Sequence, residues 1–327
     1  QQHPKNPGRL SSQDLVQYQA KEREVLCFDH LVRTSVFEIC GFPPPSSGAI
    51  AIGQILGLLQ HTPNSFKAPV EGVLDADWLH DYAQASRLAF ADRAQYVADP
   101  DFVEAPAGDW RSLLDPAYLK LRAQLMGPTS LKQTPAGIPL RAQSSAYGPM
   151  PYQAEFGTSH ISIIDAYGNA LAMTTTIENA FGARQMVRGF LLNNELTDFS
   201  FVPRYAQGRP IANRVQANKR PRSSMSPTLV FDKATGELLM STGSPGGEMI
   251  IHFTTKTLIG VLHWGMSPQQ AIDLPNFGAI FGVLGDPMVV EEKRFSAGTL
   301  QSLRARGAEV RELALTSGIQ AIVKRPV

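Results

Sequence analysis

A threonine that follows a glycine at the start of a strand-like run is the first pattern in this chain that could carry chemistry. The segment Gly157-Thr158-Ser159-His160 comes after a linker and directly before an apolar run. A threonine hydroxyl is a poor nucleophile alone, and it becomes useful when its own free α-amine acts as the base, which requires the preceding peptide bond to be cut. A glycine before the threonine allows the strained turn that such self-cleavage needs. In isolation, however, a threonine at a strand start is ordinary and favours a structural role.

The residue types that often bind metals give no comparable pattern. The seven histidines show no HExxH or other metal-ligand spacing, so the sequence predicts no metal site, and His160 is expected to pack or to orient a neighbour. Cys27 and Cys40 lie in neither a CxxC nor a Cys/His spacing. This favours two buried thiols without chemistry, although a disulfide between them remains open.

Composition limits the classes of protein to consider. The chain has 327 residues, of which 43% are hydrophobic, and a formal net charge of +1. That is enough for a large core in one large domain or two modest ones. The nearly neutral charge does not favour nucleic acid or an anionic membrane surface as a partner. No apolar stretch reaches the roughly 18 residues that are needed to span a bilayer.

The candidate nucleophile lies where the predicted elements change from helices to strands. A stiff proline-rich turn leads into an apolar segment that is predicted to be a helix at residues 49–60, and helical spacing predicts further helices at 77–97 and 110–125. A linker that is rich in Pro, Gly, Ser and Gln follows at 127–153. Strand pairs are then expected at 160–165 with 170–176 and at 228–231 with 238–241. Helices are expected at 247–263, 268–273 and 296–306, and a last strand at 318–323. Two sheets with helices outside them would bury this pattern.

Several blocks occur in one order along the chain, and together they resemble the gamma-glutamyltransferase family. The blocks include Gly157-Thr158-Ser159-His160, Thr174-Thr175-Thr176, Asn193-Asn194-Glu195, Ser223-Ser224-Met225-Ser226-Pro227 and Ser244-Pro245-Gly246-Gly247. The resemblance implies that residues 1–157 are the C-terminal part of a large subunit, mainly helical and ending in a linker. Residues 158–327 would be the small subunit with its N-terminal nucleophile. The implied fold is α+β, the αββα sandwich of N-terminal-nucleophile hydrolases.

The same resemblance assigns four residues to catalysis. Thr158 matches the nucleophile that is released when the Gly157–Thr158 bond is cut, and Thr176 matches the threonine that hydrogen-bonds it. Gly246 and Gly247 match the pair whose N–H groups form an oxyanion hole. Adjacent glycines before a helix can point N–H groups at one developing negative charge, although the pair alone favours a plain turn.

Substrate binding is also implied by matched positions. Glu195 and Asp198 match the acids that hold the substrate ammonium, and Ser223 and Ser224 match the hydroxyls that bind its carboxylate. Without the resemblance, these segments would indicate a solvated loop and a turn. Glu178 stands where the family usually has an Asn near the substrate α-carboxylate, and an ionised Glu there would repel that group. The family's arginine for the α-carboxylate comes from a region before the part matched here.

The expected activity is therefore acyl transfer or hydrolysis through a Thr158 acyl-enzyme, with no metal or organic cofactor. Substrates would be glutathione-like gamma-glutamyl amides, with water or an amino acid as acceptor. Partners would be the large and small subunits of one precursor, in the periplasm or secreted. Glu178 favours one alternative, a glutaryl or cephalosporin acylase of the same family. Another alternative is an unprocessed binding protein without activity.

Overall fold

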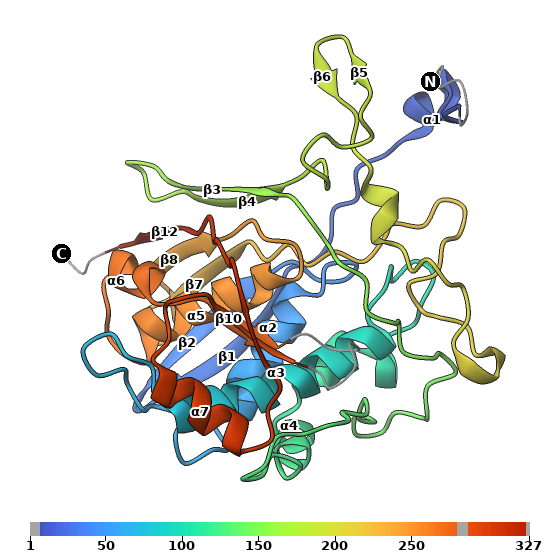
Figure 1. Ribbon diagram of the computed structural model, residues 1–327. Helices are drawn as coiled ribbons and strands as arrows, with labels where there is room; N and C mark the ends of the chain where they lie inside the picture. Colours follow the sequence, from blue (N-terminus) through green and yellow to red (C-terminus); the bar gives the residue numbers. More distant parts are fainter. Residues whose placement is uncertain (1–6, 280–286, 325–327) are drawn as a thin grey trace.

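A five-stranded antiparallel sheet is built from both halves of the chain (Figure 1). The computed structural model describes residues 7–279 and 287–324. The strand order is β1-β2-β7-β8-β12, with β1 (Leu26–Val32), β2 (Ser35–Gly41), β7 (Thr228–Asp232), β8 (Leu238–Gly243) and β12 (Gln320–Val323). Strands β7, β8 and β12 confirm the predictions at 228–231, 238–241 and 318–323. Because β2 pairs with β7, segments on either side of Thr158 share one sheet.

The sequence analysis missed β1 and β2, which pair as a hairpin. Asp29 and His30 interrupt the apolar alternation of β1, so its period was not recognised. Cys27 and Cys40 lie directly opposite each other in this pair and form a disulfide, with Cα atoms 4.1 Å apart. The favoured prediction of two buried free thiols is therefore wrong. Strand register brings the two sulfur atoms together, and Cys27 is only half-buried.

Apolar helices pack on one face of the sheet. The helices α2 (Gly48–Leu59) and α5 (Met249–Leu262) contact its strands, and α3 (Ala76–Tyr96) packs against α2 (Figure 1). All three helices were predicted from the sequence. α2 is buried around nearly its whole circumference, as a helix between two layers must be. Asp75 caps α3 by accepting hydrogen bonds from the N–H groups of Asp77 and Trp78. In the ranges that the structure describes, the remaining α-helices are α1 (Ser12–Gln17), α4 (Pro116–Ala123), α6 (Pro268–Asp273) and α7 (Ala297–Ala305).

A two-stranded hairpin lies over the sheet on the side away from α2 and α5 (Figure 1). It consists of β3 (Ser159–Ile164) and β4 (Ala170–Thr175), as predicted, and it contacts β8 and β12. On its inner side, Ser241 Oγ of β8 donates a hydrogen bond to the carbonyl oxygen of Leu171 at 3.0 Å. Its outer side carries four exposed apolar side chains, Ile161, Ile163, Leu171 and Met173. The hairpin therefore fixes where the chain leaves Thr158.

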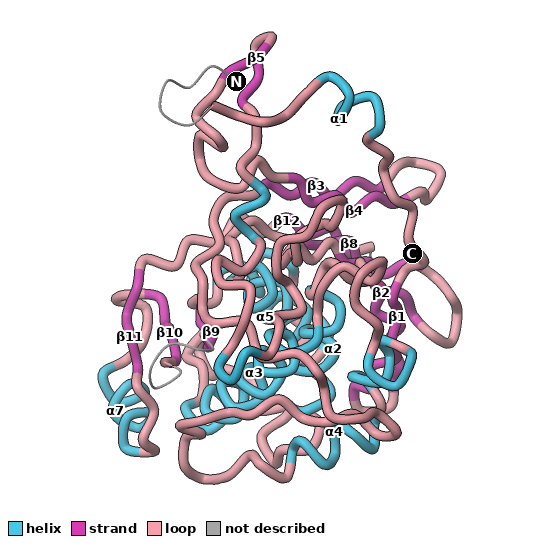
Figure 2. Tube along the Cα trace, turned by 90° about the vertical axis from the view of Figure 1, so that its right-hand side faces the viewer, coloured by secondary structure: helices cyan, strands magenta, loops and turns pink. Residues whose placement is uncertain are grey.

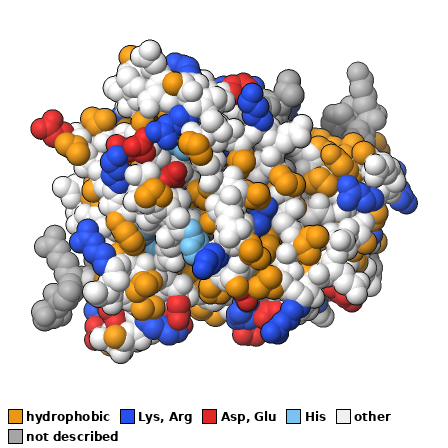
Figure 3. Space-filling view, turned by 90° about the horizontal axis from the view of Figure 1, so that it is seen from below, with side chains coloured by type: hydrophobic (Ala, Val, Ile, Leu, Met, Phe, Trp, Pro, Cys, Tyr) orange, Lys and Arg blue, Asp and Glu red, His pale blue; other side chains and the backbone are white. Residues whose placement is uncertain are grey.

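The remaining strands lie at the periphery. A three-stranded sheet of order β11-β10-β9 stands beside α7 (Figure 2), with β9 (Phe277–Ala279), β10 (Met288–Glu291) and β11 (Val310–Leu313). A short arm of β5 (Met186–Val187) and β6 (Phe190–Leu191) projects away from the sheet (Figure 1). Seen from below, the surface mixes apolar side chains with both signs of charge (Figure 3). The fold is α+β, as expected. Within the described ranges, no helix has the length and apolar content to cross a membrane.

Candidate active site

The structure brings the predicted site residues together at one small cavity. Eight of them line it: Thr158, Thr176, Glu178, Glu195, Asp198, Ser223, Ser224 and Gly247. Gly157 and Gly246 are the chain neighbours of two of these residues. The ten site residues come from the start of β3, the end of β4, the 3-10 helix Glu195–Asp198, the loop before β7 and the loop before α5. No single segment of the chain could have formed this arrangement.

The Gly157–Thr158 bond lies in a strained part of the backbone. Gly157 has φ +72°, and Thr158 has φ +117°. A positive φ is a genuine outlier for a β-branched residue such as threonine, and such strain persists only where the surroundings impose it. A Cβ at position 157 would overlap the backbone carbonyl of Glu178. The site therefore needs glycine at this position for both conformational and steric reasons.

The two glycines after β8 face this bond. Gly246 N–H donates a long hydrogen bond to the carbonyl oxygen of Gly157, with 3.4 Å between nitrogen and oxygen. Gly246 has φ +134° and Gly247 has φ +56°, so both adopt backbone conformations that favour glycine. A Cβ at Gly247 would overlap the carbonyl of Glu155. The loop thus presents an N–H donor to the carbonyl that an attacking hydroxyl on Thr158 would reach.

Thr176 and Glu178 hold the turn after β4. Thr176 Oγ1 accepts a hydrogen bond from the N–H of Glu178 at 2.7 Å, and no hydrogen bond joins Thr176 to Thr158 in residues 7–279. The Glu178 carboxyl group accepts the N–H of Phe156 at 3.1 Å and the side-chain amide of Asn194 at 2.6 Å. Glu178 is therefore turned towards the segment before Thr158 and towards Asn194.

Two further acids line the same cavity from a short 3-10 helix, Glu195–Asp198. Burial is the main reason that the pKa of Asp198 is raised to about 8, and the charges of Glu155 and Glu195 add to it. Burial likewise raises the pKa of Glu195 to about 7, with Glu178 and Glu155 contributing. At neutral pH, the intact chain thus holds a substantial part of this pair in the protonated form.

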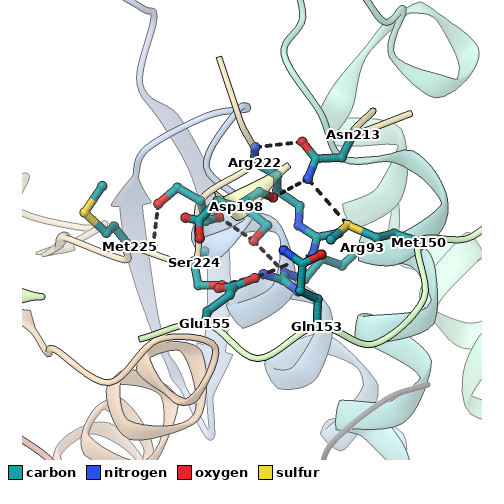
Figure 4. Close-up of polar contacts among 12 residues, drawn as sticks. Arg93, Met150, Gln153, Glu155, Asp198, Asn213, Arg222, Ser224 and Met225 are labelled. Carbon is teal, nitrogen blue, oxygen red and sulfur yellow. Dashed lines mark hydrogen bonds and ion pairs between the residues drawn. The ribbon is translucent and has the colours of Figure 1, made fainter. Parts of the chain in front are cut away.

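The two serines behave differently. Ser223 Oγ accepts the N–H of Met225 at 3.1 Å and so stabilises its own turn. Ser224 Oγ donates a short hydrogen bond to a carboxylate oxygen of Glu155 and accepts one from Arg93 (Figure 4). Arg93 Nη2 also donates to Glu155 at 2.8 Å. Of the two serines predicted to bind a substrate carboxylate, Ser224 contacts a carboxylate of the chain itself, and Ser223 does not.

Sequence reasoning missed Arg93 and Glu155. Arg93 lies on the same buried face of α3 as Trp78 and Tyr82. A charged residue at such a position is unusual, and this could have marked Arg93 as a candidate site residue. Glu155 is the only acid between Gly127 and Thr158, which was a second available signal. His160 stays within the hairpin, where Thr174 Oγ1 lies 2.7 Å from Nδ1 and Ser162 Oγ 3.1 Å from Nε2. Burial lowers the pKa of His160 to about 4.

Comparison with known proteins gives one consistent result. A family model described as Gamma-glutamyltranspeptidase matches residues 1–326. The glutathione hydrolase proenzyme of Escherichia coli (strain K12) is 35% identical over 332 residues, which cover 100% of this chain and 53% of that protein. An acylase ACY 1 proenzyme of Pseudomonas sp. (strain V22) is 31% identical over 326 residues, covering 98% of this chain and 52% of that protein. The chain thus spans about half the length of these curated relatives.

The fold is also found among solved structures. A cephalosporin acylase from Bacillus halodurans superimposes with a TM-score of 0.78 at 20% sequence identity, covering 98% of this chain and 52% of the other. At that identity the likeness concerns the fold alone. The family model and the relatives above 30% identity go further, because their matches extend over the whole or nearly the whole chain and so include the segments that line the cavity. The chain belongs to the gamma-glutamyltranspeptidase family.

Proposed function

We propose that Thr158 cuts the chain before itself and then hydrolyses or transfers the γ-glutamyl group of glutathione-like amides. One observation carries this proposal. The Gly157 carbonyl oxygen lies at the N–H of Gly246, and the residue that follows this carbonyl is a threonine held at positive φ. An oxyanion donor and a strained bond thus meet at the residue whose hydroxyl would attack.

In the processing step, Thr158 Oγ attacks the carbonyl carbon of Gly157 and the C–N bond breaks. The acyl group moves to oxygen, and the threonine nitrogen gains a proton. Water then cleaves the ester, leaving a carboxylate on Gly157 and a free α-amine on Thr158. That amine is the base that was locked in an amide before cleavage, so the intact chain is the inactive form.

In turnover, the Thr158 amine takes the hydroxyl proton as oxygen attacks the γ-amide carbonyl. Gly246 and Gly247 stabilise the oxyanion, the amine leaving group takes the proton, and an acyl-enzyme remains. Water or the amino group of an amino acid then attacks this ester, and the hydroxyl of Thr158 is restored. Thr176, which lies two residues before Glu178 in the turn after β4, orients the nucleophile in this proposal.

The substrate head group fits the division of charge around the cavity. Glu195 and Asp198 would hold the ammonium group, and Ser223 and Ser224 would hold the α-carboxylate. The position of Ser224 against a carboxylate supports this side of the assignment. A zwitterionic head group satisfies both sides at once, which favours a γ-glutamyl over a glutaryl donor.

Glu178 supports the alternative of a glutaryl or cephalosporin acylase, because a negative charge there disfavours an α-carboxylate. The geometry of the intact chain weakens this argument against a γ-glutamyl substrate. The Glu178 carboxyl group already receives two hydrogen bonds, from Phe156 N–H and Asn194 Nδ2. After cleavage, the donor from Phe156 would be lost, so the orientation of Glu178 in the cut protein decides between the two substrate classes.

Further features of the family extend the proposal. Residues 1–157 and 158–327 would be parts of a large and a small subunit from one precursor, in an αββα sandwich. The sheet and the β3–β4 hairpin would be its two β layers, with α2 and α5 on one side. Location in the periplasm or outside the cell is proposed on the resemblance to exported relatives alone.

The experiment is expression from the complete gene that encodes this chain, followed by N-terminal sequencing and assay of two chromogenic amides. We expect a new chain that starts Thr158-Ser159-His160 and faster turnover of γ-glutamyl-p-nitroanilide than of glutaryl-p-nitroanilide. The reverse preference would establish the acylase alternative. A chain that stays whole and turns over neither amide would instead be a binding protein, and it would refute the proposal.

A further inference from the structure

We propose that Arg93, Arg222 and Ser224 form a substrate-carboxylate site that Glu155 occupies until the chain is cut. This inference rests on the proposed function for the identity of the later occupant, and it deepens it by adding two arginines and the residue that blocks them. Before cleavage, Glu155 stands in for the substrate. After cleavage, the segment that carries it can leave.

The contacts of Glu155 are those of a bound ligand (Figure 4). One carboxylate oxygen accepts from Arg93 Nη2 at 2.8 Å and lies 3.6 Å from Arg222 Nη2, and the other accepts from Ser224 Oγ. The side chains of all three charged residues are less than 10% exposed. Arg93 is itself fixed, because its Nε donates to Ser47 Oγ at 2.8 Å. The site is therefore preorganised and dry, which strengthens charge-assisted hydrogen bonds.

The cradle has more donors than Glu155 uses. Two guanidinium groups directly contact the Glu155 carboxylate, while Asp198 and Glu248 act on Arg222 only through their charge. Arg222 Nε and Nη1 have no hydrogen-bond partner in the part of the chain that the structure describes. Buried donors without partners are unusual in folded proteins. A carboxylate on a free ligand, unlike one on a tethered chain, could shift to meet Arg222 with two parallel hydrogen bonds. The unused donors thus indicate that Glu155 fills the site only in part.

Cleavage changes how Glu155 is held. It lies two residues before the Gly157–Thr158 bond, so the segment is tethered at both ends before the cut and at one end after it. Besides the contacts of Glu155, the segment is held by Gln153, which is bound to backbone groups of Thr197, Phe199 and Phe201, and by Phe156 N–H, which donates to Glu178. The ring of Phe156 is exposed. Loss of one tether lowers the effective concentration of Glu155 at the cradle. A substrate carboxylate can then compete for the arginines.

Departure of Glu155 would also prepare the opposite side of the cavity. Its charge is among the causes that raise the pKa of Asp198 and of Glu195, after burial. Once Glu155 leaves, both acids ionise more readily. One event would thus open the carboxylate site and charge the residues proposed to bind the ammonium group.

The test is binding of glutarate, a simple dicarboxylate, by calorimetry to variants of the uncut chain. All of them carry Thr158→Ala, so the nucleophile is absent and the result does not depend on whether the natural chain is cut or turns over substrate. Four variants are compared. The first carries Thr158→Ala alone, the second adds Glu155→Ala, the third adds Gln153→Ala instead, and the fourth adds both Glu155→Ala and Arg93→Met. Gln153→Ala is the matched control, because it loosens the same segment but keeps the carboxylate.

We expect Glu155→Ala to tighten glutarate binding at least tenfold, Gln153→Ala to tighten it far less because the carboxylate and both covalent tethers remain, and Arg93→Met to remove the gain. Equal binding with and without Glu155, or a gain that survives Arg93→Met, would overturn the inference. If the Glu155→Ala variant melts too early for calorimetry, Glu155→Gln keeps the shape of the side chain. Glutarate must then raise the Tm of that variant more than the Tm of Thr158→Ala alone, and an equal rise would also overturn the inference.

Discussion

Substitution of Gly157 by alanine tests whether the backbone at the cleavage site is built for self-cleavage. Gly157 has φ +72°, where an alanine costs about 1–2 kcal/mol relative to glycine. In addition, the new Cβ would overlap the backbone carbonyl of Glu178, an atom that cannot rotate away. The two backbone segments must therefore separate. The hydrogen bond from Gly246 N–H to the Gly157 carbonyl is already 3.4 Å long, so a further displacement would break it.

The size of the effect follows from that lost donor. Removing one oxyanion-hole donor typically slows a reaction about 100- to 1,000-fold, or about 2.7–4 kcal/mol of barrier. The matched control is Gly168→Ala in the β3–β4 turn. Gly168 has φ +89° with open space around its Cβ position, so it carries the conformational cost alone. It should lose about 1–2 kcal/mol of stability and still be cut at the natural rate.

The assay follows cleavage with time, after expression from the complete gene, as the appearance of a chain that begins at Thr158. Gly157→Ala should be cut at least about 100-fold more slowly than the natural protein, while a thermal melt shows that it is folded. The reasoning is wrong if the folded Gly157→Ala variant is cut within a factor of about three of the natural rate, because the oxyanion contact would then not limit the reaction.

Three further outcomes are expected. Thr158→Ala should abolish both cleavage and turnover, and residual processing in that variant, seen by mass spectrometry, would refute the assignment of the nucleophile. Gly246→Ala should slow cleavage and lower kcat per mole of cut chain, each about 100- to 1,000-fold, because a Cβ there would overlap the ring of Phe253 and displace the N–H donor. Gly265→Ala, which also has positive φ but an open environment, should leave both rates unchanged in the same assays. Burial, with nearby charges, raises the pKa of Asp198 to about 8 from 3.8. The protonated Asp198 contributes its full share to the free energy of unfolding below the ordinary pKa of 3.8, and this share is lost as pH rises through the folded-state pKa of about 8. The Tm of the uncut chain should therefore fall between about pH 5 and about pH 9, and Asp198→Asn should reduce that fall while Glu237→Gln at an exposed site does not.

Local sequence patterns were sufficient for much of the fold. Local patterns such as apolar content and helical spacing predicted α2, α3 and α5, and turn residues between β-rich runs predicted the β3–β4 and β7–β8 hairpins. Both kinds of signal depend on residues only a few positions apart, which a sequence displays directly. The β1–β2 pair failed this test because polar residues interrupt its alternation.

The identities of the candidate site residues were also determined by the sequence, through ordered blocks that resemble one family. Their convergence was not. The loops that carry Glu195 and Ser224 reach Thr158 only because β7 pairs with β2, β8 pairs with β7, and the β3–β4 hairpin lies over β8. Such contacts between distant segments depend on the packing of the whole core, for which no local pattern exists.

The state of the site was decided by tertiary structure alone. The sequence shows Glu155 as a lone acid in a linker and Arg93 as one polar residue of a long helix. In the folded chain they form a buried ion pair at 2.8 Å, in the place where a substrate carboxylate was expected. Burial and neighbouring charge, which raise the pKa values of Glu195 and Asp198, exist only after folding, whereas the hydroxyl and glycines at the cut site can be read in the linear chain.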